Sequence, residues 1–103
     1  MPNAARGNGV DSVSSPDGAG YLCASPMTTA TNECSGNVFV NSIGSVRIGD
    51  KVAAHPKAGC GPDLSGLSTS SPNVFVNGKG MGRLGDVYGD NTITSGSPNV
   101  IVN

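Results

Sequence analysis

The sequence predicts a small all-β domain, β-rich with long irregular loops. Two observations carry this prediction. Gly, Ser, Asn and Pro together occupy 46 of the 103 residues, and they are spread so evenly that a sustained helix would have to include several helix-breaking residues. In addition, a short block of β-forming residues occurs three times.

The repeated block reads Asn-Val-Phe-Val-Asn at residues 37–41 and 73–77, and Asn-Val-Ile-Val-Asn at residues 99–103. Three apolar β-formers between two turn residues are typical of a short buried strand. The second copy continues into Asn77-Gly78, which is the dipeptide most typical of a tight hairpin turn. We therefore expect three short strands, each preceded by a turn.

A second block follows the first two copies at a fixed distance: Arg-Ile-Gly-Asp at residues 47–50 and Arg-Leu-Gly-Asp at residues 83–86. We interpret each Arg and Asp as a solvated ion pair that braces a turn. The third copy reaches the end of the sequence, but if the two ends were joined, Arg6 would stand six residues after Asn103, as Arg47 stands six residues after Asn41. The sequence thus predicts a ring of three units, the third split between the termini.

The loops between the units differ in length, because the strand blocks lie 36, 26 and 41 residues apart around this ring. All three cysteines and the single histidine fall in the two longer loops: Cys23, Cys34, His55 and Cys60. Three thiolates and an imidazole form a complete tetrahedral set for structural zinc, with iron as the alternative metal. A Cys23–Cys34 disulfide with Cys60 free, or three inert thiols, are the other interpretations.

Composition excludes several classes of protein. The net charge is −1 and the charges are scattered, whereas a nucleic-acid or anionic-membrane binder needs a clustered basic face. No apolar run reaches the ~18 residues of a membrane span, and the first residues lack the pattern of a signal peptide. With no Trp and four other aromatic residues, the core is small, so we expect a staple or a partner to stabilise it.

These blocks, together with the Pro-x-Ala-Ala-Arg segment at residues 2–6, resemble the PAAR-repeat family over nearly the whole chain. The family forms the sharpened tips of contractile phage tails and type VI secretion systems. The resemblance implies one cone-shaped domain over residues 1–103, with a metal near its apex and a three-sided base on a trimeric spike. It assigns the metal to Cys23, Cys34, His55 and Cys60. It assigns the spike-binding base to the strand blocks, Val38, Phe39, Val40, Val74, Phe75, Val76, Val100, Ile101 and Val102.

We therefore expect a structural, non-enzymatic tip that caps one homotrimeric spike, carries one structural zinc ion and touches the target-cell envelope transiently. It would be made in the cytoplasm without a signal peptide and would act at a virion tail tip or a secretion-system spike tip, with no nucleic-acid or small-molecule substrate. A free-standing metal-stabilised module that binds a glycan or a surface is the alternative. A metal-dependent hydrolase is a further one, but four protein ligands would close its metal site.

Overall fold

The computed structural model describes residues 2–15, 27–52, 66–88 and 91–102, and the side chains within these ranges except those of Ser15 and Met27. The described residues contain no helix, and therefore none that is long and apolar enough to cross a membrane. They form short strands, which confirms the β-rich prediction: β1 (Ser12–Ser15), β2 (Met27–Ala30), β3 (Phe39–Val40), β4 (Ile43–Gly44), β5 (Phe75–Val76), β6 (Lys79–Gly80), β7 (Val87–Tyr88) and β8 (Asn91–Ile93).

Two of the strand blocks form hairpins with two-residue turns. β3 pairs with β4 and β5 with β6, both antiparallel. The turn residues Asn77 and Gly78 have φ values of 53° and 76°, the left-handed conformation that such turns require at both positions. The predicted hairpin at Asn77-Gly78 is therefore confirmed. Asn41 and Ser42 make the same turn, with φ values of 53° and 66°.

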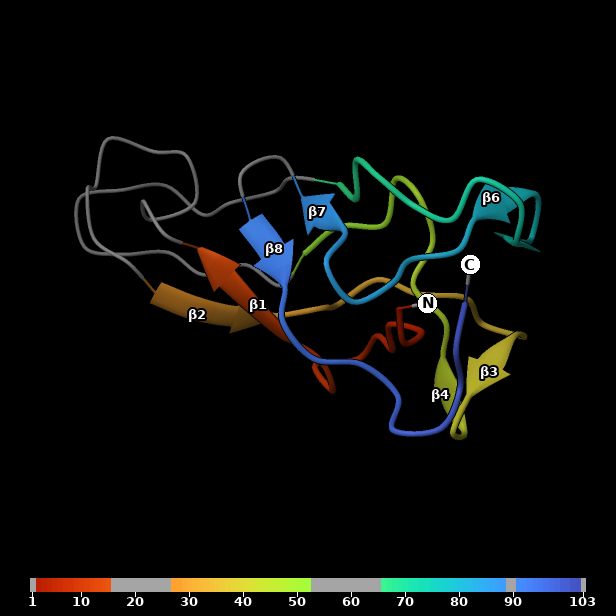
Figure 1. Ribbon diagram of the computed structural model, residues 1–103, viewed down its shortest axis with the longest axis horizontal. Coiled ribbons are helices and arrows are strands. Elements are labelled where there is room, and N and C mark those ends of the chain that lie inside the picture. The colour runs from red at the N-terminus through yellow and green to blue at the C-terminus, as the bar shows by residue number, and fades with distance from the viewer. Residues whose placement is uncertain (1, 16–26, 53–65, 89–90, 103) are drawn as a thin grey trace.

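The third strand block completes its hairpin with residues from the other end of the chain. Asn3 bridges Ile101, and the backbone N–H of Val102 donates to the carbonyl of Pro2 at 2.8 Å. Residues 2 and 102 thus lie side by side, at the place where the other two units have a turn (Figure 1). The predicted closure of the ring through the termini is confirmed. We call the three units the first repeat (residues 35–50), the second repeat (71–86) and the third repeat (97–102 with 2–11).

At the centre of the molecule the three repeats are joined by a closed triangle of backbone hydrogen bonds. The N–H of Ala5 donates to Gly82 at 3.0 Å, that of Gly82 to Val46 at 2.8 Å, and that of Val46 to Ala5 at 3.3 Å. These residues each stand one position before the Arg of their repeat. Since each corner donates to the next and accepts from the previous one, the triangle fixes a pseudo-three-fold axis.

On one side of this triangle lies the sheet, in the order β2-β1-β8-β7, and on the other lie the hairpins (Figure 1). The edges of the sheet are joined by the remaining chain: Thr31 bridges Val52, Lys51 bridges Gly66, and the N–H of Ser68 donates to the carbonyl of Val87. Pairing therefore continues around the axis. Two small cores result. The sheet core contains Ala5, Val13, Val46, Val52, Leu67, Tyr88 and Ile93, and the hairpin core contains Ala4, Val40, Val76, Met81 and Val102.

The interpretation of each strand block as a short buried strand holds for only one of its three apolar residues. Only the last residue is buried, namely Val40, Val76 or Val102, and each strand has two residues at most. The middle residue is exposed, and the first is half-buried or, in Val38, just exposed. The reason is the period of two: one face of each strand points into the closed ring, so the middle side chain points out of it.

The N-terminal segment is predicted to be essential for folding. Deleting residues 1–6 removes the buried Ala4 and Ala5, one corner of the triangle, and Arg6, which pairs with the fully buried Asp11. Each lost hydrogen bond costs about 1 kcal/mol and an unpaired buried charge several more. Together these losses are comparable to the whole stability of a small domain.

We expect the truncated chain to show no cooperative thermal unfolding by circular dichroism. Val10→Ser, a change at an exposed site in the same segment, is the matched control and should leave the Tm unchanged. A truncated chain that melts within a few degrees of the full chain would contradict closure, since exposed chain ends usually tolerate deletion.

Tyr88 gives the fold a pH dependence. It lies in the sheet core with none of its surface exposed, and its hydroxyl has no hydrogen-bond partner among the described residues. Burial raises the pKa of this hydroxyl, and the nearby Asp50 and Asp11 raise it further. Above the ordinary tyrosine pKa of about 10, the unfolded chain releases a proton that the folded chain keeps. The free energy of unfolding therefore falls as the pH rises above about 10.

Tyr88→Phe should remove this alkaline loss and change stability at pH 7 by no more than about 1 kcal/mol, because the hydroxyl has no bond to lose. The Tm of both proteins between pH 7 and 11.5 measures the difference, and Tyr21 is common to both. Parallel Tm curves for the two proteins over this range would refute the assignment.

Candidate functional site

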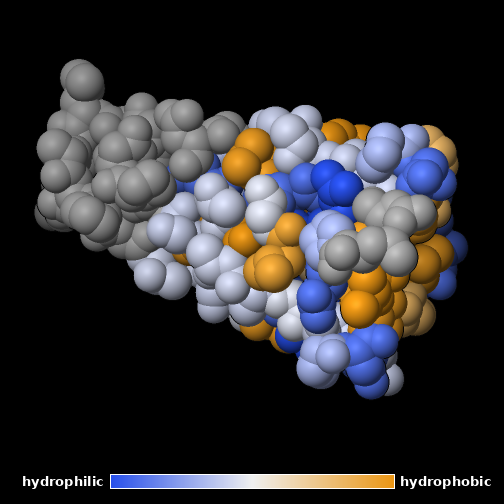
Figure 2. All heavy atoms as spheres, viewed as in Figure 1, coloured by the Kyte–Doolittle hydropathy of each residue, from blue (hydrophilic) through white to orange (hydrophobic). Residues whose placement is uncertain are grey.

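The end of the molecule that carries the hairpins presents three apolar side chains to solvent. Phe39 is 59%, Phe75 62% and Ile101 57% exposed. They occupy the middle position of the three strand blocks, so the pseudo-three-fold axis places them at one level. We call them the outer triad. Figure 2 shows apolar surface at this end of the molecule, over the hairpins.

Each member of the outer triad is held by a buried neighbour. Val40, Val76 and Val102, which follow the triad residues in sequence, are 3 to 4% exposed and pack in the hairpin core. Val74 and Val100 are partly buried against the same core, and Val38 lies at its edge with 36% exposed. The nine residues assigned to the base therefore divide into an outward set and an inward set. Among these nine residues, the outer triad offers most of the exposed apolar surface.

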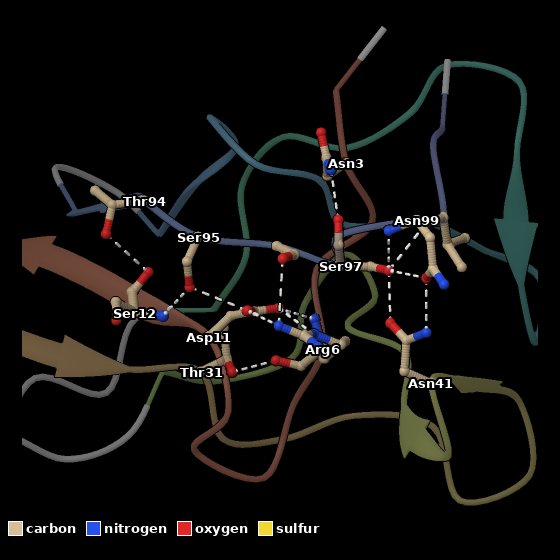
Figure 3. Close-up of polar contacts among 12 residues, drawn as sticks. Asn3, Arg6, Asp11, Ser12, Thr31, Asn41, Thr94, Ser95, Ser97 and Asn99 are labelled. Carbon is tan, nitrogen blue, oxygen red and sulfur yellow. Dashed lines mark hydrogen bonds and ion pairs between the residues drawn. The ribbon is translucent and has the colours of Figure 1, made fainter.

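Serines and asparagines tie the hairpins to one another. The Ser97 hydroxyl donates to Oδ1 of Asn41 at 2.5 Å, and Nδ2 of Asn41 donates to Oδ1 of Asn99 at 2.9 Å (Figure 3). Ser35, Asn77 and Asn37 make the equivalent contacts at 2.6 and 3.0 Å. Each contact joins the end of one strand block to the start of another, so the asparagines fix the relative positions of the hairpins.

Sequence reasoning identified these asparagines as turn residues and missed this second role. The signal that could have found it is the spacing Ser-x-Asn, which opens all three blocks, at Ser35, Ser71 and Ser97. The serine hydroxyl also accepts the backbone N–H groups two and three residues further on, for instance those of Asn99 and Val100.

An Arg–Asp pair braces each repeat beside the triangle. In the second repeat the backbone N–H and Nε of Arg83 donate to Oδ2 of Asp86 at 2.8 and 2.9 Å, and Nη2 donates to Oδ1 at 3.0 Å. Arg47 and Asp50 repeat this geometry. The hydrogen bond to the carboxylate is the main cause that raises the pKa of each guanidinium. The predicted pairs form, but their carboxylates are buried rather than solvated.

The third repeat makes the same pair with two extra residues. Arg6 donates to Asp11 from its backbone N–H, Nε and Nη2, at 2.6, 3.1 and 2.8 Å (Figure 3). The hydrogen bond to Asp11 likewise raises the pKa of Arg6. The extra residues form a turn in which Val10 is exposed. Because only the third repeat has this turn, the ring departs from three-fold symmetry there and keeps it at the hairpins.

Of the four candidate metal ligands, the structure describes one. Cys34 is a partly exposed free thiol that packs between Gly7 and Gly44, where an added Cβ would lie 2.3 Å from the Cys34 Cβ and 2.5 Å from its Sγ, respectively. Ser70 packs against Gly80 at the equivalent place in the second repeat. Cys23, His55 and Cys60 lie outside the described residues. Within the described ranges, no three His, Cys, Asp or Glu side chains come together as a metal site would require.

The described part of the chain also opens no cavity. What it offers chemically is a surface: three apolar side chains on a braced, nearly symmetric frame. No protein-family model matches the sequence, and no curated protein matches it. What the chain does must therefore be inferred from its own residues.

Proposed function

We propose that this protein is the structural tip of a contractile injection machine and that it caps one homotrimeric spike through the outer triad. The support is a match of symmetry. The end of a homotrimer has three identical faces, and a single chain can meet all three only if it repeats its own contact surface three times. The outer triad does so, at three equivalent positions exposed by 57 to 62%.

The chemistry of this surface favours a protein partner. The hairpin end consists of residues 2–5, 37–45, 73–81 and 99–102. Lys79 is the one charged residue within these ranges, and Nη1 of Arg47 donates to Oδ1 of Asn77 beside them at 3.2 Å. Depletion of charge around exposed aromatic and aliphatic side chains is typical of the centre of a protein–protein interface. The bracing described above holds the backbone of the hairpins in place before binding, so little loop entropy is lost on association.

A structural metal belongs to the same proposal. Cys23, Cys34, His55 and Cys60 would hold it, and their donor atoms suit zinc. A bound zinc ion would cross-link two long loops in a molecule whose hydrophobic cores are small, and its binding energy would add to folding energy. The role is mechanical and non-enzymatic, in a phage tail or a type VI secretion system, with transient contact to the target-cell envelope.

A second candidate function follows from the exposed rings of Phe39 and Phe75, since aromatic faces also bind glycans by stacking. The third equivalent position carries the aliphatic Ile101, which offers no ring. Stacking would therefore use two of the three positions, whereas a trimeric partner uses all three. For this reason we favour the spike over a free-standing glycan-binding module.

The spike proposal predicts a complex of one chain with one trimer. Mixing the purified protein with candidate trimeric spikes should give this stoichiometry in native mass spectrometry, with an interface near the standard size of about 800 Å² per side. The triple variant Phe39→Asp, Phe75→Asp, Ile101→Asp should abolish binding, because a few central residues carry most of the binding energy of an interface, each about 2 kcal/mol or more.

Val10→Asp is the control, an apolar residue that is 41% exposed and is changed in the same way outside the hairpins. It should bind as the unchanged protein does, and all variants should keep the same circular dichroism spectrum. Three chains per trimer, undiminished binding by the triple variant, or a base-to-base dimer as the stable form would each refute the proposal. Glycan binding lost in the triple variant would favour the alternative module.

The metal proposal predicts one equivalent of zinc per chain by elemental analysis. Cys60→Ser and Cys34→Ser should each lower the metal content and the Tm together. A serine can be accommodated at position 34, because Ser70 packs against Gly80 at the equivalent place. Since Cys34 also fills space against Gly7 and Gly44, the metal content of Cys34→Ser, and not its Tm alone, reports whether Cys34 binds the metal. Less than half an equivalent of any transition metal in the unchanged protein would contradict the proposal. Metal retained in Cys34→Ser alone would remove Cys34 from the ligand set.

A further inference from the structure

The outer triad is symmetric in backbone but not in side chain. The N–H groups of Ser45, Met81 and Ala4 donate to the carbonyls of Val38, Val74 and Val100 at 3.0, 2.9 and 2.9 Å, one bond in each repeat. The residue after each acceptor is a triad member, and the residue after that is buried. The three triad residues thus leave equivalent backbone positions, and their own side chains are Phe, Phe and Ile.

We propose that each chain of the trimeric spike carries one shallow apolar pocket of a size that fits a phenylalanine ring, and that the tip binds with no preferred rotational setting. This inference rests on the function proposed above and specifies its partner. Rotating the tip by 120° on a homotrimer returns the same complex, because the three spike pockets are identical. Every pocket must therefore be able to accept each of the three side chains, Phe39, Phe75 and Ile101.

Two consequences follow for the pockets. A pocket that accepts a phenylalanine at two positions is incompletely filled by isoleucine at the third, so Ile101 is the weakest contact of the triad. Furthermore, Phe39 and Phe75 meet pockets of the same composition, although they lie 36 residues apart in the chain. Identical changes at these two positions should then have similar effects on affinity, which an asymmetric partner would not produce.

The test uses the candidate spike that forms the 1:3 complex, and it measures the Kd of four proteins by calorimetry: the unchanged chain, Phe39→Ile, Phe75→Ile and Ile101→Phe. The first two variants should weaken binding by the same factor, about three- to tenfold, from the apolar area lost in a central contact. Ile101→Phe should tighten binding by about threefold. All three side chains are mostly exposed in the free protein, so the Tm should stay unchanged.

The outcomes separate this inference from the proposed function. Losses at Phe39 and Phe75 that differ by more than about threefold, or weaker binding by Ile101→Phe, would overturn the inference while the 1:3 complex stands. If no trimeric spike binds, the proposed function fails and the inference fails with it. Equal losses and a gain at position 101 would support both. If a Phe→Ile change lowers stability, Ile101→Phe still tests the inference, because enlarging the side chain at position 101 removes no contact.

Discussion

Three backbone hydrogen bonds, which join Ala5, Val46 and Gly82 in a closed triangle, are the constraint on which the rest of the molecule depends. They connect one residue from each of the three repeats, so no repeat can form this contact alone. The sheet core packs on one side of the triangle and the hairpin core on the other. Because the cores are small, the order of the structure comes largely from polar contacts: the backbone bonds, the buried carboxylates and the serine–asparagine links.

The same triangle separates a symmetric half of the protein from an asymmetric one. On the hairpin side, the three repeats have the same length and make the same backbone hydrogen bond, from Ser45, Met81 and Ala4 to Val38, Val74 and Val100. On the sheet side, the segments that join the strands differ in length, and the third repeat has its two extra residues before Asp11. A chain with this division can present a three-fold surface in one direction and unique chemistry in the other. This division would suit the tip role proposed above.

Much of this architecture could be predicted from the sequence, because it depends on local signals repeated three times. Asn77-Gly78 specifies a hairpin turn, and the distance from Asn41 to Arg47 recurs across the chain ends. The direction of the strands could not be predicted, since three apolar residues between two asparagines show no alternation. Only the closed ring determines that Phe39 faces out while Val40 faces in. The links from Asn41 to Ser97 and Asn99 escaped prediction because they join residues more than 50 positions apart.

The candidate metal site is predictable to a lesser degree. The residue types identify Cys23, Cys34, His55 and Cys60 as a ligand set, but the spacing of these four residues does not resemble a known metal-binding motif. Cys34 has a second possible role that only the structure reveals, because it fills the space over Gly7 and Gly44. A thiol chosen for its size and a thiol chosen for its affinity for metal look the same in a sequence.

The break in the chain replaces the turn of the third hairpin, and this limits how the protein can be joined to others. Any polypeptide fused to residue 2 or residue 102 begins at the hairpin end, at the rim of the surface formed by Phe39, Phe75 and Ile101. A fusion there would have to run alongside a docked partner or block it. The same constraint would hold for a circularly permuted chain in which the present ends are joined by a two-residue turn and the new ends lie at Asn77 and Gly78. A polypeptide fused to those new ends would begin at the second repeat, whose turn also lies at this rim.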